Sequence, residues 1–225
     1  MITNMPGILF DLDGTVLDSA PDIQYVINEM RQEQGLDPLS VECVRPHVSG
    51  GHAVLLDLLR NEPLLESEKK ALKTELFGRY QQHHCEYMIF FPGMEALLHH
   101  LHEQQIPWGI VTNRNTALTD KVRDRHPILN KASCIVSGDT TAHPKPHPAP
   151  LLHACSLLNI TPQSTVYIGD HSVDVIAGKA AGIKTLLMLF GYADPVEAAK
   201  WGADHIFSDA EALAAWLSKH HLPPC

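Results

Sequence analysis

The stretch GILFDLDGTVLDSAPD, residues 7–22, decides the fold and the chemistry of this chain. Residues 7–10 form an uninterrupted apolar run, which is typical of a strand buried on both faces of a parallel sheet. Asp11 and Asp13 follow directly, one residue apart. Because two close carboxylates repel each other and raise each other's pKa, their position at the end of a core strand indicates a function.

Further apolar runs of the same kind recur along the chain, at residues 108–112, 134–137, 165–169, 184–189 and 204–207. Helical periodicity separates them. Met94, Leu97, Leu98 and Leu101, for example, form one apolar stripe at the spacing i, i+3, i+4, i+7. Strands that alternate with helices predict an α/β fold with a doubly wound, Rossmann-like parallel sheet.

Residues 17–89 interrupt this alternation, because they contain helical patterns and no convincing strand. Helices are expected near residues 23–30, 53–59 and 69–80. The block lies between the first and second strands, where a sheet normally has a single crossover helix. We therefore expect an α/β core of residues 1–16 and 90–225, with a helical cap of residues 17–89 inserted after the first strand.

Composition excludes several classes of partner. The formal net charge of −9 argues against nucleic-acid binding, and no apolar run is long enough to cross a membrane. The cysteines are odd in number and scattered, at positions 43, 85, 134, 155 and 225. This pattern indicates reduced thiols and a cytoplasmic location. The sequence does not fix the oligomeric state, and a monomer is favoured.

The ends of the predicted strands carry polar side chains. Ligands of open parallel sheets bind beyond the carboxyl ends of the strands, so we expect these side chains to share one rim. The polar residues at this rim are Asp11 and Asp13 after the first strand, Thr112 and Asn113 after the second, Lys145 in the loop HPKPHPAP (143–150) after the third, and Asp170 and Asp174 after the fourth.

This set of side chains fits phosphoryl transfer. Clustered carboxylates favour a hard divalent cation such as Mg²⁺, with Asp11 and Asp170 as ligands and Asp174 as a ligand or a partner of one. The cation, Lys145 and Thr112 would hold phosphoryl oxygens, together with backbone amides around residues 12, 13 and 113. Asp13 is placed to protonate the leaving alcohol. Each residue alone has an ordinary structural explanation, so the prediction rests on their joint order along the chain.

DLDGT, VTN, the KP dipeptide and GDHSVD resemble the four motifs of the haloacid dehalogenase-like hydrolase superfamily. The resemblance covers essentially the whole chain. It implies that Asp11 is the nucleophile and that Asp13 is the general acid/base, with its backbone carbonyl on Mg²⁺. It also implies that Thr112 and Lys145 bind phosphate and that Asp170 and Asp174 bind the metal. The second acid of the first motif points to a phosphatase.

The helical insert narrows the resemblance. VRPHVSGG, residues 44–51, is similar to the substrate loop of phosphoglycolate-phosphatase-like caps, which implies that Arg45 contacts the substrate. An ordinary arginine at a helix end explains the residue equally well. The chain departs from the family at Arg114 and Asn115, where Lys and Pro are frequent, and at His171, where Ser or Asp is common.

The sequence thus predicts a Mg²⁺-dependent phosphomonoester hydrolase that acts through an aspartyl-phosphate. The partner would be a small phosphorylated metabolite, with 2-phosphoglycolate or N-acetylmuramic acid 6-phosphate implied by the resemblance. Two alternatives stay open: a sugar phosphomutase of the β-phosphoglucomutase kind, and a non-catalytic phosphate-binding protein on the same fold.

Overall fold

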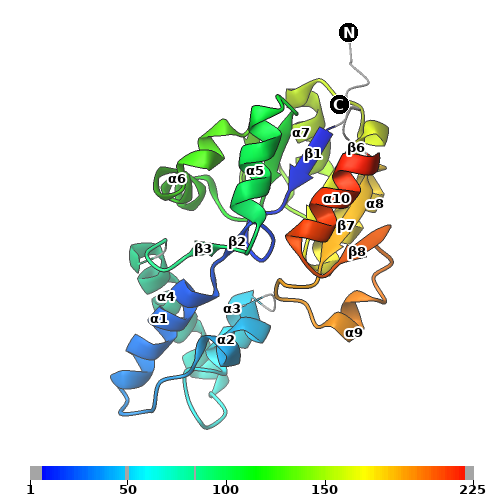
Figure 1. Cartoon of the computed structure of the whole chain (residues 1–225). Helices are drawn as coiled ribbons and strands as arrows, with labels where there is room; N and C mark the ends of the chain where they lie inside the picture. Colours follow the sequence, from blue (N-terminus) through cyan, green and yellow to red (C-terminus); the bar gives the residue numbers. More distant parts are fainter. Residues whose placement is uncertain (1–6, 49–50, 84, 221–225) are drawn as a thin grey trace. The chain divides into compact units, whose positions relative to one another are not determined.

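The computed structural model describes residues 7–48, 51–83 and 85–220 (Figure 1). The chain divides into two compact units. One, called the core unit below, comprises Met1–Leu17 and Phe90–Cys225, and the other, the inserted unit, comprises Asp18–Ile89. Each unit is described by itself.

A six-stranded parallel sheet forms the centre of the core unit, in the order β5-β4-β1-β6-β7-β8. The strands are β1 (Gly7–Phe10), β4 (Trp108–Val111), β5 (Cys134–Val136), β6 (Thr165–Gly169), β7 (Lys184–Met188) and β8 (His205–Phe207). From β1 the chain first adds β4 and β5 on one side of the sheet and then adds β6, β7 and β8 on the other side. This change of direction confirms the predicted doubly wound α/β sheet. At such a reversal the loops after neighbouring strands separate, and ligands of this architecture bind there.

Both faces of β1 are buried. Leu9 packs in an apolar cluster with Tyr167 of β6 and Leu151 of the following helical layer. Side chains alternate along a strand, so Ile8 and Phe10 face the opposite layer, and both are fully buried. A strand with two buried faces needs a continuous apolar run, which is why residues 7–10 carry no polar side chain. The same alternation places Asp11 on the side of Leu9.

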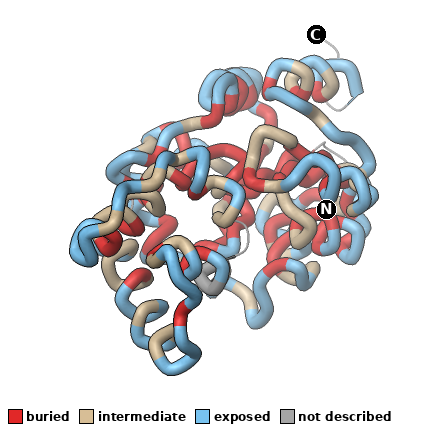
Figure 2. Tube along the Cα trace, turned by 90° about the horizontal axis from the view of Figure 1, so that it is seen from below, coloured by how far each residue is buried: buried red, intermediate tan, exposed pale blue. Residues whose placement is uncertain are grey.

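Helices cover the sheet of the core unit (Figure 1). They are α5 (Met94–Glu103), α6 (Thr116–Arg125), α7 (Ala149–Leu158), α8 (Ser172–Ala181), α9 (Pro195–Ala198) and α10 (Ala210–His220), with short 3₁₀ turns η1 (Pro127–Lys131) and η2 (Pro162–Ser164). Helices α7 and α8 pack against each other and against the strands, and α5 packs against α10. Figure 2 shows the buried segments in red and the exposed ones in pale blue.

The inserted unit is helical, as α1 (Ala20–Gln32), α2 (Val41–Val48), α3 (Gly51–Leu56) and α4 (Glu66–His83). Its own apolar cluster includes Val26, Ile27, Leu59 and Leu76. Helix α2 corrects one prediction, because residues 44–48 of the expected substrate loop are helical and residues 49–50 lie outside the described part. Pro46 lies inside α2, where it removes one backbone hydrogen bond, the one that its N–H would have donated to the Glu42 carbonyl.

The chain enters and leaves the inserted unit through a two-stranded ribbon of β2 (Leu17–Asp18) and β3 (Ile89–Phe90). On the core side of the ribbon, the Phe91 N–H donates to the Val16 carbonyl at 3.1 Å. On the inserted side, the Asp22 carboxylate accepts from the N–H groups of Cys85 and Tyr87, each at 2.7 Å. None of the helices in the described residues is long and apolar enough to cross a membrane.

Candidate active site

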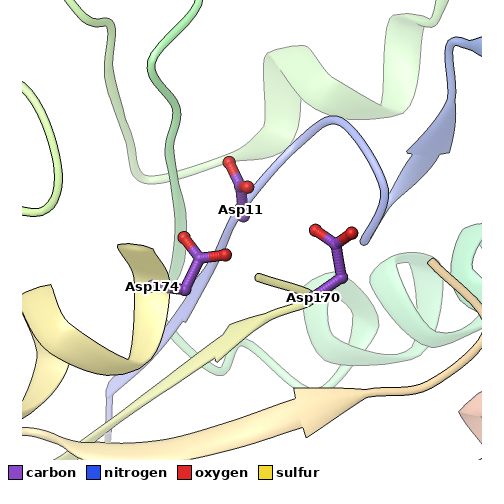
Figure 3. A group of neighbouring side chains, drawn as sticks. All are labelled: Asp11, Asp170 and Asp174. Carbon is purple, nitrogen blue, oxygen red and sulfur yellow. The ribbon is translucent and has the colours of Figure 1, made fainter. Parts of the chain in front are cut away.

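Three buried carboxylates meet beyond the carboxyl ends of β1 and β6. Asp11 follows β1, Asp170 follows β6, and Asp174 lies in the first turn of α8. Each offers one oxygen, and the three oxygens lie within 4.8 Å of one another (Figure 3). Three anionic groups in so small a buried volume require positive charge nearby.

Lys145 supplies part of that charge. Its Nζ lies 2.8 Å from Asp11 Oδ1, 2.8 Å from Asp174 Oδ1 and 2.7 Å from the Tyr167 hydroxyl. An ammonium group has three protons, so these three acceptors saturate it. Burial acts to lower the pKa of Lys145, but Asp11 and Asp174 outweigh it and raise the pKa overall. Lys145 is therefore a fixed cation that joins the two acids.

Tyr167 is a site residue that the sequence analysis missed. Its hydroxyl accepts from Lys145, and it lies 3.0 Å from both Asp174 Oδ1 and the Val111 carbonyl oxygen. One proton serves only one of these acceptors at a time. Burial raises the pKa of Tyr167 well above its usual value, with Asp174 and Asp11 acting in the same direction, so the hydroxyl stays neutral. The available signal was a tyrosine in an otherwise aliphatic buried strand, whose hydroxyl must find a partner.

The charges of the site do not balance without a further cation. Burial raises the pKa of Asp11 to about 7; Lys145 opposes this shift, while Asp174 and Asp13 add to it. Burial also raises the pKa of Asp170 well above its usual value, with Asp174 and Asp11 adding to the effect. The donors are all carboxylate oxygens, which suit hard cations such as Mg²⁺ and Mn²⁺. The three acids can therefore hold a metal ion.

Two glycines make room for Asp170. The carboxylate accepts from the Tyr192 N–H at 2.9 Å and from the Thr15 hydroxyl at 3.3 Å. Gly14 has φ +85°, and a Cβ added there would lie 2.3 Å from Asp170 Oδ2. A Cβ at Gly191 would lie 2.3 Å from the Gly14 carbonyl oxygen and 2.5 Å from Asp170 Cβ. The backbone at these two positions thus lies so close to the Asp170 carboxylate that any residue with a Cβ would collide there.

Gly191→Ala is expected to displace Asp170 and to destabilise the protein by about 1–3 kcal/mol, because its Cβ would overlap backbone atoms that cannot move independently. Urea unfolding would measure the loss. The control is Gly78→Ala in α4, where a Cβ meets no atom within 4 Å. There the alanine should stabilise by about 0.5–1 kcal/mol through its helix propensity. Equal effects of the two substitutions would contradict this packing argument.

Thr112 and Asn113 follow β4 as predicted, but their side chains do different things. Thr112 is 2% exposed, and its Oγ1 accepts from the Arg114 N–H at 3.1 Å, which leaves its hydroxyl proton for another acceptor. Asn113 binds the backbone of Lys145 twice: its Nδ2 donates to the carbonyl oxygen and its Oδ1 accepts from the N–H, both at 2.9 Å. The Asn113 side chain therefore positions the lysine.

Asp13 lies two residues beyond Asp11 and is bound by Arg114. The guanidinium donates to both carboxylate oxygens, from Nε at 3.1 Å and from Nη2 at 2.5 Å. The Arg114 side chain is 5% exposed and that of Asp13 is 25% exposed. The carboxylate therefore has one side on the arginine and another side open to solvent.

Arg45 lies on α2 of the inserted unit. Its Nη2 lies 2.5 Å from Oδ2 of Asp18. The other carboxylate oxygen of Asp18, Oδ1, accepts a hydrogen bond from the Ala20 N–H at 3.0 Å. The buried Nε of Arg45 has no hydrogen-bond partner among the described residues. The structure thus holds Arg45 through one end of its guanidinium and leaves Nε unused.

Known proteins resemble the chain over nearly its whole length. The family model of haloacid dehalogenase-like hydrolases matches residues 8–188. An N-acetylmuramic acid 6-phosphate phosphatase of Pseudomonas aeruginosa is 35% identical and covers 96% of each chain. A phosphoglycolate phosphatase of Xanthomonas campestris is also 35% identical, over 93% of this chain and 96% of the relative. A solved structure, a predicted phosphoglycolate phosphatase from Haemophilus somnus, aligns with a TM-score of 0.76 at 27% identity, over 96% of this chain and 99% of that one. The chain therefore belongs to the haloacid dehalogenase-like hydrolase family.

Proposed function

We propose that this protein is a Mg²⁺-dependent phosphomonoesterase that works through a phosphorylated Asp11. The observation that carries the proposal is the meeting of Asp11, Asp170 and Asp174 around the buried Lys145. A carboxylate can attack an anionic phosphoryl group only where positive charge offsets their repulsion. A site for binding alone would not require three mutually repelling buried acids.

Asp11 has one oxygen available for attack. Its Oδ1 accepts from the Leu12 N–H at 2.7 Å and from Lys145, whereas Oδ2 has no hydrogen bond to the described residues. These two contacts of Oδ1 fix the orientation of the carboxylate. We infer that Oδ2 needs no change of side-chain conformation before it attacks. Such fixed orientation is a large part of what an enzyme contributes to a substitution reaction.

The reaction has two steps. Asp11 Oδ2 attacks phosphorus, and the bond between phosphorus and the alcohol oxygen breaks as Asp13 gives that oxygen a proton. Asp13, now a carboxylate, then takes a proton from water while the water oxygen attacks phosphorus. The bond from Asp11 to phosphorus breaks and releases inorganic phosphate. The Thr112 hydroxyl, the Lys145 charge and the backbone amides near residues 12, 13 and 113 stabilise the phosphoryl oxygens.

The donor set fits the metal that the family generally uses. Asp11 and Asp170, with Asp174 and the backbone carbonyl of Asp13, would hold Mg²⁺. When bound, the ion neutralises charge between the attacking carboxylate and the phosphoryl oxygens. Asp174 already contacts Lys145, Tyr167 and the His171 N–H. We therefore propose that Asp174 also orients its neighbours.

The substrate is a small phosphorylated metabolite. The relatives are named for N-acetylmuramic acid 6-phosphate and for phosphoglycolate, and we propose these two compounds as candidates. The phosphate group would be bound by the core unit. We propose that the inserted unit acts as the cap that recognises the remainder, with Arg45 as one contact. Location in the cytoplasm stays a prediction from the cysteine pattern.

Phosphate release with Mg²⁺ tests the proposal. We expect turnover of 2-phosphoglycolate or N-acetylmuramic acid 6-phosphate, loss of turnover with a chelator, and recovery when Mg²⁺ is returned. A hundredfold preference in kcat/KM for one compound, about 2.7 kcal/mol of transition-state discrimination, would identify the substrate. A panel of sugar phosphates gives the comparison.

Other outcomes would point elsewhere. Conversion of a sugar phosphate into its isomer without release of phosphate would show a phosphomutase. Binding of phosphate with no turnover of any compound, with Mg²⁺ present, would show a non-catalytic protein. Either result would overturn the proposed hydrolysis.

A further inference from the structure

We propose that Arg114 is a positioning residue for Asp13, and that it supports proton transfer to the leaving alcohol. The inference rests on the proposed phosphatase function, in which Asp13 is the general acid. It concerns a residue outside the set of acids, lysine and threonine from which that function was argued.

The contact is a two-point ion pair between distant parts of the chain. Nε and Nη2 of Arg114 each bind a different oxygen of Asp13, at 3.1 Å and 2.5 Å. The planar guanidinium carries its donors in a fixed fork, so two parallel bonds set the plane of the carboxylate as well as its position. A lysine, with a single ammonium centre, would not fix that plane.

Arg114 is itself held from several directions. Its side chain is 5% exposed. Its backbone N–H donates to the Thr112 hydroxyl at 3.1 Å, and its carbonyl oxygen accepts from the Gly138 N–H at 2.8 Å. Because both its backbone and its side chain are constrained, Arg114 transmits a defined geometry to Asp13. It also links the acid to the neighbouring phosphate-binding candidate, Thr112.

The chemistry explains why this arrangement helps catalysis. A carboxylate has about four lone-pair positions, and the fork uses one on each oxygen, so the fork itself does not prevent the carboxyl group from carrying a proton. When Asp13 gives its proton to the departing oxygen, negative charge develops on its carboxyl group. A buried guanidinium already in contact with that group stabilises the charge most when the proton has left, which lowers the barrier.

A structural role alone is the competing explanation. The pair also joins the loop after β1 to the loop after β4, so its loss would lower stability in any case. The two explanations differ in their dependence on the leaving group. General-acid assistance matters for an alkyl phosphate, whose alkoxide is a poor leaving group, and hardly matters for nitrophenyl phosphate, whose anion leaves without a proton.

The experiment compares kcat/KM for 2-phosphoglycolate and 4-nitrophenyl phosphate in the wild type and in Arg114→Met. The ratio kcat/KM includes only the steps up to departure of the leaving group, so the second step does not enter. We expect a loss of about 100-fold for the alkyl phosphate and less than about threefold for the aryl phosphate. Arg114→Lys, which keeps the charge without the fork, should lose about tenfold for the alkyl phosphate.

Three controls make the result decisive. In an Asp13→Asn background, Arg114→Met should cause little further change in kcat/KM, because the group that it positions is gone. Arg123→Met in α6 removes an exposed arginine that is paired with Asp120 at 3.1 Å. This substitution should change kcat/KM for neither the alkyl nor the aryl phosphate. Thermal unfolding shows which variants are folded at the assay temperature, and the assay is run below that limit.

Equal losses for both substrates in Arg114→Met, or no loss for either, would overturn the role of Arg114 while leaving the phosphatase intact. Absence of phosphate release by the wild type from both compounds, with Mg²⁺ present, would instead contradict the proposed function. The two failures are thus separate observations.

Discussion

Asp11→Asn is expected to abolish phosphate release, with kcat reduced by at least about 10⁴-fold. The amide cannot form the phosphorylated intermediate, and the remaining groups stabilise charge but have no nucleophile to act with. The measurement is phosphate release with Mg²⁺ on the preferred substrate. Retention of phosphate by the wild type after acid quench, and its absence in Asp11→Asn, would locate the intermediate on this residue. Turnover near the wild-type level would show that Asp11 is not the nucleophile.

The same substitution is expected to stabilise the metal-free protein at alkaline pH. Burial raises the pKa of Asp11 to about 7, so the folded state disfavours its ionised form relative to the unfolded state. This penalty is absent below about pH 4, grows between pH 4 and 7, and is constant above pH 7. Asparagine carries no charge and removes the penalty, on the order of 1–4 kcal/mol. Melting temperatures in chelator should therefore diverge as the pH rises from 5 to 8, with the variant above the wild type.

Lys145→Met is expected to have the second largest effect, because it removes the only side-chain cation that contacts Asp11 and Asp174 among the described residues. Breaking a buried ion pair by deleting one partner costs about 3–5 kcal/mol. We expect that loss of stability, and a fall in kcat/KM of at least about 10³-fold from lost charge stabilisation. Unfolding by urea and phosphate release would measure the two effects.

The matched control is Lys200→Met, which removes an exposed lysine paired with Glu197 at 2.6 Å. Exposed ion pairs contribute about 0–1 kcal/mol, so both stability and activity should be nearly unchanged. If Lys145→Met kept wild-type activity with only reduced stability, Lys145 would be structural and the phosphate-binding assignment would be wrong.

The predicted fold rested on local patterns that tertiary contacts did not override. Residues 7–10 and 165–169 are continuous apolar runs, and both became buried strands of the parallel sheet. The predicted end of the second strand differs by one residue, because Thr112 follows β4 and its side chain lies at the site. The acids could be grouped from sequence because the topology of a parallel sheet brings strand ends to one edge.

Contacts within that edge could not be predicted in the same way. The fork of Arg114 on Asp13 joins residues 101 positions apart, and the bond from Lys145 to Tyr167 spans 22 positions. No local periodicity encodes such pairs. The space requirement at Gly191 is similar, because it depends on the path of Gly14 in another loop. The sequence therefore predicts which functional groups the site contains. It does not predict which of these groups contact one another, because those contacts depend on the tertiary structure.

Helix α2 shows the opposite failure, where a recognised motif suggested the wrong local structure. The segment with Arg45 and Pro46 was expected to be a loop because residues 44–51 are similar to the substrate loop of phosphoglycolate-phosphatase-like caps. Only the Val44 side chain of α2 is fully buried, in the apolar cluster of the inserted unit. The partly buried Val48 packs against the same cluster, and α2 contacts α1 and α3, so tertiary packing holds these helical turns around the proline.

The paired strands β2 and β3 have an evolutionary consequence. The insertion begins at β2 and ends at β3, which are hydrogen-bonded neighbours. Its length therefore places no constraint on the six-stranded sheet, because the chain leaves and returns at nearly the same point. Asp22 ties the two ends together within the inserted segment itself. Such a segment can diverge, lengthen or be replaced by another without altering the register of β1 against its neighbours. Under the proposed role of the inserted unit in substrate recognition, substrate preference can change in one part of the gene while the chemistry is inherited unchanged in the other.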